Sequence, residues 1–241
     1  MSGGRPFHFR FFSMMHEAAT MKIGTDAMLL GAWTRIPEKG KALDIGTGSG
    51  ILALMVAQRS EKLMIEAIDI DQLSVDQALF NFEASRWRER LLAITCSIQS
   101  FFLPSTAEKY QLILSNPPYF TSTFKSNLER KNLARHTDSL NHRQLIEAAA
   151  RLLHPQGLFS VIIPYDFANT FVAVAAESGL FLQRKLTIVP VEGKSANRVA
   201  LELSFENKNK PEIQQLTIRR SDSSFTPAYN NLLKDFYLGI I

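Results

Sequence analysis

The sequence predicts a doubly wound α/β fold whose sheet is mostly parallel, with an antiparallel hairpin at one edge. From residue 41 onward, short apolar runs rich in branched residues alternate with segments of helical periodicity, which is typical of a parallel sheet covered by helices. A glycine-rich loop follows the first apolar run directly. Two more strand-like runs, joined by a turn, follow the last alternating unit and provide the antiparallel pair.

The alternating region supplies the parallel strands and the helices between them. The expected strands cover residues 41–45, 63–69, 91–97, 110–115 and 157–164. The expected helices cover residues 51–58, 72–87, 143–154 and 165–178. Because helical crossovers make successive strands parallel, the carboxyl ends of these strands meet at one edge of the sheet, which is where doubly wound folds bind ligands.

The region after residue 180 is expected to form the hairpin and a terminal helix. Residues 181–191 and 197–205 are the two hairpin strands, and the turn lies at Glu192-Gly193-Lys194-Ser195-Ala196. In the tail, Thr226 is a good N-cap and Pro227 suits the first helical position. A helix is therefore expected to begin there and to continue toward Tyr237.

The first forty residues are expected to be an extension of a single domain that covers residues 1–241. Phenylalanines and cations are interleaved near its start, namely Arg5, Phe7, His8, Phe9, Arg10, Phe11 and Phe12. Aromatic side chains mostly serve burial, so this extension either packs on the core or forms a lid over a substrate or cofactor. The sequence leaves both interpretations open.

Length and composition exclude several classes of protein. With 241 residues, 46% of them hydrophobic, the chain can bury one core and is short for two domains. Cys96 is the only cysteine, which excludes an internal disulfide and a cysteine-rich zinc site, and no metal is expected. No apolar run is long enough for a signal peptide or a membrane span, so a cytoplasmic location is expected. The excess of Lys and Arg over Asp and Glu, 27 against 23, suits a polyanionic partner.

The glycine-rich loop is the first candidate ligand site. Gly46-Thr47-Gly48-Ser49-Gly50 lies between the first expected strand and its helix, where glycines let a ligand approach the backbone. Asp44 precedes the loop, and a carboxylate there repels a pyrophosphate but stabilises a ligand that carries an ammonium and a sulfonium. Asp44, Gly46, Thr47, Gly48 and Gly50 are therefore candidates for binding S-adenosylmethionine. In the alternative interpretation, Asp44 caps an ordinary strand-to-helix turn.

The second expected strand ends in Asp69, about twenty residues after the glycine loop, where a carboxylate can accept hydrogen bonds from both hydroxyls of a ribose. Asp69 and the adjacent Ile70 are therefore further candidates for cofactor binding. Asp71 is the alternative ribose acid, and it also suits the N-cap of the following helix.

The fourth expected strand runs directly into Asn116-Pro117-Pro118-Tyr119, whose prolines end the strand and keep the backbone rigid. An exocyclic amine on an aromatic ring is a poor nucleophile because its lone pair is delocalised. The side-chain carbonyl of Asn116 and the backbone carbonyl of Pro117 can each accept one N–H of such an amine and localise the lone pair. Tyr119 can stack on an extruded base. These four residues are the candidate catalytic residues.

In these motifs the chain resembles the class I amino-methyltransferases, and over almost its whole length it resembles the bacterial tRNA adenine-N6 methyltransferases that modify adenine 37 of a valine tRNA. The family-specific likeness lies in Phe9-Arg10-Phe11-Phe12 and in residues 21–33. It continues through the glycine loop, the Asn116 motif, Ala134-Arg135-His136 and residues 229–237.

The resemblance implies a Rossmann-like class I methyltransferase fold that binds S-adenosylmethionine and methylates N6 of an adenine in tRNA. It implies that Asp44, Gly46, Gly48 and Asp69 hold the cofactor. It also implies that Asn116 lies against the cofactor while it presents the adenine amine. The implied partner is tRNA, and no metal, membrane or stable protein partner is indicated.

One position departs from the family pattern. After the third strand, many relatives carry an Asp that bonds the adenine of the cofactor, whereas this chain has Ser97. A hydroxyl is a weaker acceptor than a carboxylate. Ile98, through its backbone, and Gln99 are the other candidates for that contact.

Several alternatives remain open. Residues 120–142 form a polar, basic stretch that either clamps RNA phosphates or is a solvated connection, and its basic residues are Lys125, Arg130, Lys131, Arg135 and His136, with Arg143 just beyond it. The Asn116 motif can present any planar amine, so ribosomal RNA guanine, DNA adenine and a release-factor glutamine amide are alternative targets. A catalytically silent domain that binds RNA or protein is a different class of function.

Overall fold

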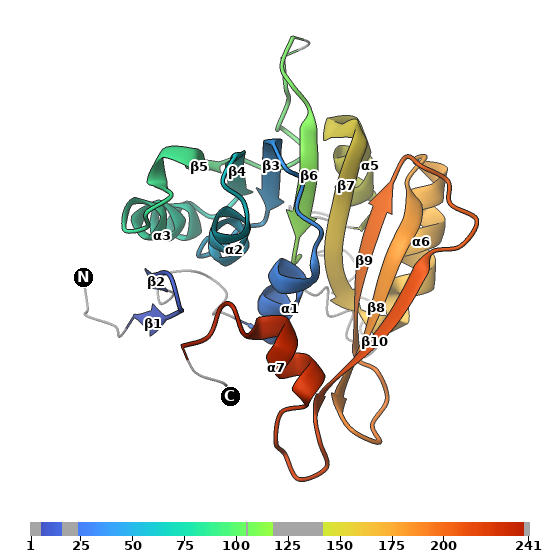
Figure 1. The fold of residues 1–241 in the computed structure, drawn as a ribbon. Coiled ribbons are helices and arrows are strands. Elements are labelled where there is room, and N and C mark those ends of the chain that lie inside the picture. Colours follow the sequence, from blue (N-terminus) through green and yellow to red (C-terminus); the bar gives the residue numbers. More distant parts are fainter. Residues whose placement is uncertain (1–5, 16–23, 105, 118–141, 239–241) are drawn as a thin grey trace, which may run out of the picture.

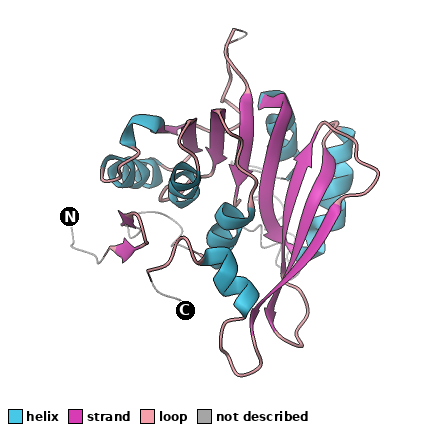
Figure 2. Ribbon diagram, in the orientation of Figure 1, coloured by secondary structure: helices cyan, strands magenta, loops and turns pink. Residues whose placement is uncertain are grey.

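The computed structural model describes residues 6–15, 24–104, 106–117 and 142–238, and they form a mixed sheet with helices on both faces (Figures 1 and 2). The eight strands of the sheet are β3 (Gly40–Ile45), β4 (Leu63–Asp69), β5 (Leu91–Thr95), β6 (Tyr110–Ser115), β7 (Leu153–Pro164), β8 (Phe181–Val191), β9 (Arg198–Ser204) and β10 (Glu212–Arg219). Their spatial order is β10-β8-β9-β7-β6-β3-β4-β5.

The strand directions bring the carboxyl ends of most strands to one edge of the sheet, called the carboxyl edge below. β3 is parallel to β4 and to β6, β4 is parallel to β5, and β6 is parallel to β7. β9 is antiparallel to both β7 and β8, and β10 is parallel to β8. The carboxyl edge is therefore shared by all strands except β9.

Two hydrophobic clusters cover the two faces of the sheet. The first lies between the sheet and α1 (Thr25–Trp33), α2 (Ile51–Arg59), α3 (Gln72–Glu83) and α7 (Pro227–Leu233). The second lies between the sheet and α5 (His142–Leu152) and α6 (Ala168–Glu177), which follows the short 3-10 helix η2 (Tyr165–Phe167). A second 3-10 helix, η1 (Arg88–Arg90), leads into β5. The doubly wound α/β prediction is thereby confirmed.

The antiparallel hairpin is found as β8 and β9, but the outermost strand on that side is β10, which the sequence analysis did not predict. β10 pairs in parallel with β8, so the hairpin lies one strand inside the edge. Of its residues only Leu216 is buried. Because an exposed edge strand needs few apolar side chains, its sequence carries a weak strand signal.

Some element ends differ from the predicted ones for local reasons. α3 ends at Glu83 instead of continuing to residue 87, because the Ser85 hydroxyl donates to the Phe82 carbonyl and closes the helix. The segment expected to be one helix from residue 165 begins as the 3-10 turn η2. The terminal helix has the expected cap, since the Thr226 hydroxyl accepts the backbone N–H of Tyr229 at 3.2 Å.

The N-terminal residues pack beside α2 and α3 as a small antiparallel pair, β1 (Phe7–His8) and β2 (Ser13–Met14). Phe9, Phe12 and Met14 are buried in the first hydrophobic cluster, whereas Phe7 and Phe11 are exposed. Some phenylalanines of this N-terminal segment therefore pack in the core, and others are exposed to solvent. Within the described ranges, no helix is long and apolar enough to span a membrane.

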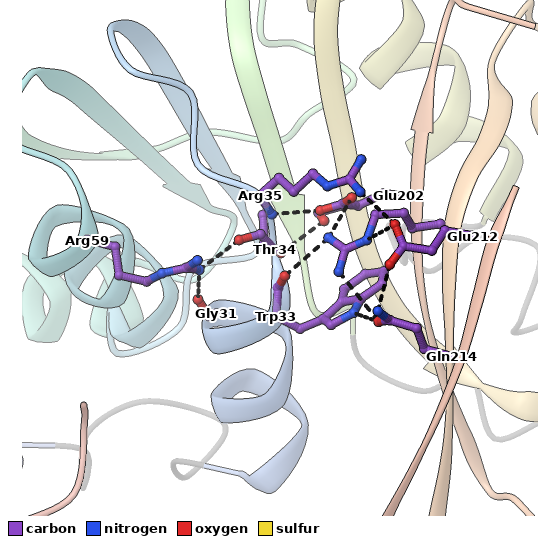
Figure 3. A network of polar contacts seen from close by, with 10 residues as sticks. Gly31, Trp33, Thr34, Arg35, Arg59, Glu202, Glu212 and Gln214 are labelled. Atoms are coloured by element: carbon purple, nitrogen blue, oxygen red, sulfur yellow. Dashed lines mark hydrogen bonds and ion pairs between the residues drawn. The ribbon is translucent and has the colours of Figure 1, made fainter. Parts of the chain in front are cut away.

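A buried polar network fixes the end of α1 against β8, β9 and β10 (Figure 3). Glu202 on β9 is fully buried and accepts the Arg184 guanidinium at 3.1 Å and the backbone N–H of Arg35 at 2.7 Å. The same guanidinium lies 4.3 Å from the centre of the Trp33 ring, whose indole N–H donates to Gln214 on β10 at 2.7 Å. The network ties α1 to three strands that lie far from it in the sequence.

This network predicts a large loss of stability when one partner is removed. Arg184→Met leaves the Glu202 carboxylate buried without its counter-ion, and we expect the free energy of unfolding to fall by about 3–5 kcal/mol. Replacing both residues by apolar ones should recover most of that loss. Urea unfolding measures the effect, and the exposed pair Arg143–Glu177 is the matched control, where Arg143→Ala should cost less than about 1 kcal/mol. An equal loss in the two single variants would contradict this account.

Candidate functional site

The carboxyl ends of β6, β3, β4 and β5 lie side by side and bring most of the described candidate residues together. In the sheet register, Ile45 at the end of β3 is opposite Ile68 of β4 and Ser115 of β6. Neighbouring strands are about 4.8 Å apart, so the residues that follow these strands lie within a few strand spacings of one another. The four strand ends therefore form one continuous candidate site.

The glycine loop turns back onto the end of β4. Gly46, Gly48 and Gly50 all have positive φ angles, 71°, 55° and 86°, which other residues rarely adopt. The backbone N–H groups of Gly46 and Thr47 donate to the Ile68 carbonyl at 2.8 and 3.0 Å. The N–H of Gly48 donates to the Asp69 carboxylate at 2.9 Å. These bonds fix the loop to the neighbouring strand.

The three glycines have different surroundings. A Cβ atom added to Gly46 or Gly48 would meet nothing within 4 Å, so both positions face open space. A Cβ atom on Gly50 would lie 2.5 Å from the Phe82 ring of α3. Gly46 and Gly48 therefore leave room for a ligand above the backbone, whereas Gly50 allows α2 and α3 to pack closely.

Asp44 lies beneath the loop, fully buried. Its Oδ2 atom accepts the Thr47 hydroxyl at 2.7 Å, and its Oδ1 atom has no hydrogen-bond partner in the part of the chain that the structure describes. Burial raises the pKa of this carboxyl to about 7, against lowering by the Thr47 hydroxyl and the Ala53 backbone N–H. The Thr47 contact, which fits the capping interpretation, engages one oxygen, and the other keeps capacity to accept a hydrogen bond from a ligand.

Asp69 and Asp71, the two candidate ribose acids, have different hydrogen-bond partners. Asp71 is the N-cap of α3 and accepts the backbone N–H and the hydroxyl of Ser74 at 3.0 and 2.7 Å. Asp69 holds the glycine loop through Gly48 and also accepts the backbone N–H of Asp71 at 3.0 Å. Ile70 between them is exposed and offers an apolar surface beside Asp69.

The residues after β5 are close to this edge, and their side chains make local contacts. The Ser97 hydroxyl bonds the hydroxyl and the backbone N–H of Ser100, at 3.1 and 3.2 Å. Ile98 is buried, and Gln99 donates to Gln144 on α5 at 3.3 Å. Ser97 therefore stabilises a turn at the position where the family resemblance led us to expect an Asp, and its hydroxyl is already engaged.

Asn116 follows β6 directly. The preceding Ser115 hydroxyl donates to the Ile45 carbonyl at 2.9 Å, which ties the ends of β6 and β3 together. The Oδ1 atom of Asn116 is buried and has no hydrogen-bond partner among the described residues, and Pro117 is also buried. Pro118, Tyr119 and the basic stretch up to residue 141 lie outside the described residues. Arg143 pairs with Glu177 at 2.9 Å.

The hydrogen-bond acceptors of this site suit a cationic ligand that carries N–H groups. Buried acceptors without a partner are uncommon in folded proteins, and here Asp44 Oδ1 and Asn116 Oδ1 belong to the ends of adjacent strands. Gly46 and Gly48 leave the space above the glycine loop open. The acidic residues of the site, Asp44 and Asp69, can provide negative charge for a cation. Among the residues described, no group of three or more His, Cys, Asp or Glu side chains could hold a metal ion.

One residue that the sequence analysis missed connects this site to the N-terminal segment. Asn81 of α3 is buried, and its side-chain amide donates to the carbonyls of Ser49 and Met15, each at 2.8 Å. Its Oδ1 atom accepts the backbone N–H of Met15 at 2.8 Å. The only signal in the sequence was a polar residue on the apolar face of a helix, next to Phe82.

Comparisons with known proteins agree with this geometry. The profile of the family described as Methyltransferase small domain matches residues 14–171. A tRNA1(Val) (adenine(37)-N6)-methyltransferase of Trichodesmium erythraeum is 42% identical over 98% of this chain and 99% of that protein. An enzyme of the same name from Tolumonas auensis is 40% identical over 98% of each chain. The chain belongs to this methyltransferase family. The predicted family, enzyme class and S-adenosylmethionine cofactor are thereby confirmed.

Solved structures support the fold. A predicted O-methyltransferase from Agrobacterium tumefaciens is similar with a TM-score of 0.65 and 18% identity, over 88% of this chain and 96% of that one. A ribosomal protein L11 methylase from Lactobacillus delbrueckii is similar with a TM-score of 0.50 and 19% identity, over 74% and 76%. At these identities the likeness shows a shared architecture, the Rossmann-like methyltransferase fold.

The raised pKa of Asp44 predicts a pH-dependent affinity for the cationic cofactor. Below about pH 7 the carboxyl of the free protein is protonated, and it must lose its proton before it can stabilise a positive charge. The dissociation constant of S-adenosylmethionine should therefore rise as pH falls below 7, toward roughly tenfold per pH unit. Calorimetric titration at several pH values between 5.5 and 8 measures it, and Asp44→Asn should bind weakly without this dependence. A wild-type affinity that stays constant across this range would show that Asp44 does not titrate as described.

Proposed function

We propose that this chain transfers the methyl group of S-adenosylmethionine to the exocyclic N6 amine of adenine 37 in a valine tRNA. The observation that carries the proposal is the buried Oδ1 atom of Asn116, directly after β6, which has no hydrogen-bond partner among the described residues; the Oδ1 atom of Asp44, near the end of the adjacent strand β3, has none there either. One acceptor suits an amine to be methylated and the other suits a cationic methyl donor. Relatives about 40% identical over nearly the whole chain carry this activity in their names.

The cofactor is held along the ends of β3, β4 and β5. When bound, it supplies an electrophilic methyl group on a positively charged sulfur. Asp44 stabilises its positive charge, and the backbone of the glycine loop, from Gly46 to Gly50, borders it. Asp69 keeps acceptor capacity for ribose hydroxyls, because a carboxylate offers about four lone-pair sites and two are used by backbone N–H groups.

The adenine end of the cofactor lies toward β5 in this proposal. The exposed side chain of Ile70 supplies apolar contact for a flat ring. Because the Ser97 hydroxyl is engaged with Ser100, the polar contact falls to the backbone of Ile98 or to Gln99.

The chemical step depends on how Asn116 and Pro117 hold the target amine. The Asn116 carbonyl oxygen and the Pro117 backbone carbonyl each accept one amine N–H, which localises the nitrogen lone pair and stabilises the positive charge that develops on nitrogen. Asn116 also borders the cofactor, since it follows the strand next to β3. Pro118 keeps the motif rigid and Tyr119 stacks on the extruded base. The mechanism requires neither a strong base nor a metal ion.

The remaining proposals concern RNA binding, the extent of the domain and the place where the enzyme acts. The net charge of +4 favours a polyanion, and the basic residues between 120 and 142 are proposed to contact RNA phosphates. We place residues 1–241 in one domain, with residues 1–40 as its extension. Since tRNA is modified and used in the cytoplasm, the enzyme is proposed to act there.

The decisive experiment is transfer of labelled methyl from S-adenosylmethionine to total tRNA from a strain that lacks this enzyme, followed by nucleoside analysis. Label recovered as N6-methyladenosine in one valine tRNA is the expected result. Label in ribosomal RNA, DNA or a release factor would keep the chemistry and overturn the substrate. No transfer to any of them, with intact cofactor binding, would favour the catalytically silent alternative.

The proposed division of labour predicts opposite behaviour for two variants. Asn116→Ala removes an acceptor for the target amine, and loss of one such preorganised group should lower kcat by about 100-fold or more with little change in cofactor affinity. Asp69→Ala should mainly weaken cofactor binding. Single-turnover rates at saturating cofactor, together with calorimetric affinities, separate the two effects. Turnover of Asn116→Ala near the wild-type rate would refute the proposed presentation of the amine.

A further inference from the structure

We propose that Arg10 and Arg86, held against the exposed ring of Phe11, form a clamp for the phosphate backbone of the tRNA substrate. This inference rests on the proposed function, because it assigns a contact surface for that RNA. The three residues, called the arginine clamp below, lie outside the residues assigned to the cofactor and to the target amine. Two sequence-distant segments build it, the turn between β1 and β2 and the chain after α3.

The Phe11 ring positions both guanidinium groups. The guanidinium carbon of Arg10 lies 5.6 Å from the ring centre, and that of Arg86 lies 5.2 Å from it. Arg86 also lies 5.1 Å from the Trp87 ring. Phe11 remains 46% exposed. Cation–π contacts of this kind hold long side chains in place and leave their N–H groups available to solvent.

The backbone that carries Phe11 is itself fixed. The Phe9 N–H donates to the Phe12 carbonyl at 2.8 Å and closes the turn, and the Arg10 N–H donates to the Phe236 carbonyl at 2.7 Å. Phe12 is buried, and its ring meets that of Trp87 edge-on at 5.8 Å. Because the platform is ordered before binding, an RNA ligand loses little further conformational entropy in ordering it.

The positive charges of the clamp are not neutralised within the described chain. Neither guanidinium forms an ion pair with a carboxylate of the described residues, and the one polar contact of Arg10 is with the Lys234 carbonyl at 3.4 Å. Four other arginines, Arg35, Arg143, Arg184 and Arg198, do pair with carboxylates. Two neighbouring unneutralised guanidiniums suit phosphate groups, which accept their N–H donors.

The clamp lies within reach of the site. Phe11 and Met15 are four positions apart in the chain, a stretch that spans at most about 14 Å. Met15 is bonded on both its N–H and its carbonyl to Asn81, and Asn81 also bonds the Ser49 carbonyl of the glycine loop. An RNA strand carries one phosphate per few ångströms of its length, so an RNA segment of several nucleotides can reach the clamp while one base lies at Asn116.

The test uses the full-length protein and an unmodified valine tRNA transcript. Equilibrium binding is measured between 50 and 300 mM salt, chosen as roughly the range over which phosphate contacts change affinity most. We expect Arg10→Ala with Arg86→Ala to weaken binding at least about tenfold at low salt and to flatten the slope of log affinity against log salt by about one to two. The KM for tRNA should rise, whereas kcat and the affinity for S-adenosylmethionine stay unchanged.

Matched controls separate the clamp from general charge. Lys39→Ala removes an exposed cation that lies before β3, at the opposite edge of the sheet, and should leave binding and slope nearly unchanged. Phe11→Ala should weaken binding, because it removes the ring that holds Arg10 and one of the two rings that hold Arg86. Phe102→Ala removes another exposed ring, one that lies 4.8 Å from the Arg151 guanidinium, and should have no effect. Urea midpoints equal to the wild-type value verify that the exposed substitutions leave the fold intact.

Two results would overturn the clamp: an affinity and salt slope of the double arginine variant equal to those of the wild type, or losses no larger than that of Lys39→Ala. Because binding is measured directly, this outcome is distinct from failure of the proposed function. If the wild type binds the transcript through the clamp but methylates only another macromolecule, the clamp stands and the assigned substrate falls.

Discussion

The hydrogen bonds that join the glycine loop to the end of β4 are the constraint on which the candidate site depends. Three consecutive N–H groups, from Gly46 to Gly48, point at one carbonyl and one carboxylate of that strand. Such a turn requires positive φ angles on both sides of Thr47, and glycine adopts them without strain. Once the loop is fixed in this way, Gly46 and Gly48 face open space, and Asp44 is buried.

Sealing Asp44 carries an energetic cost that a bound cation can offset. The rise of its pKa from 3.8 to about 7 corresponds to roughly 4 kcal/mol against ionisation in the protein without cofactor. Since the folded-state value is the higher one, the burial destabilises the fold as pH rises from about 4 to 7, and the cost is complete above pH 7. A carboxyl kept in this position fits a site that is completed by a positively charged ligand better than a purely structural role.

The sequence predicted what depends on apolar runs and on local turn chemistry. β4, β6 and β8 have their predicted bounds, and the Thr226 cap and the strand ends that carry Asp44, Asp69 and Asn116 were predicted from neighbouring residues alone. What it missed depends on tertiary contacts. β10 has only one buried side chain, Leu216, so its pairing with β8 leaves little trace in the pattern. The sequence named Asp69 as the ribose acid and Asp71 as the alternative, but it could not show that the Gly48 N–H donates to Asp69, because that bond joins two strand ends.

Asn81 shows how far such a tertiary contact extends. Its side chain makes three hydrogen bonds, one to the Ser49 carbonyl and two to the N–H and the carbonyl of Met15. It thereby satisfies both backbone groups of Met15, as pairing with a β-strand would. An apolar residue of similar size would leave two carbonyls and an N–H without partners in a buried place, which is costly for each group. The glycine loop and the β1–β2 pair are consequently held to the same helix, α3. The cofactor loop and the segment that carries Arg10 and Phe11 are therefore linked through one side chain of α3.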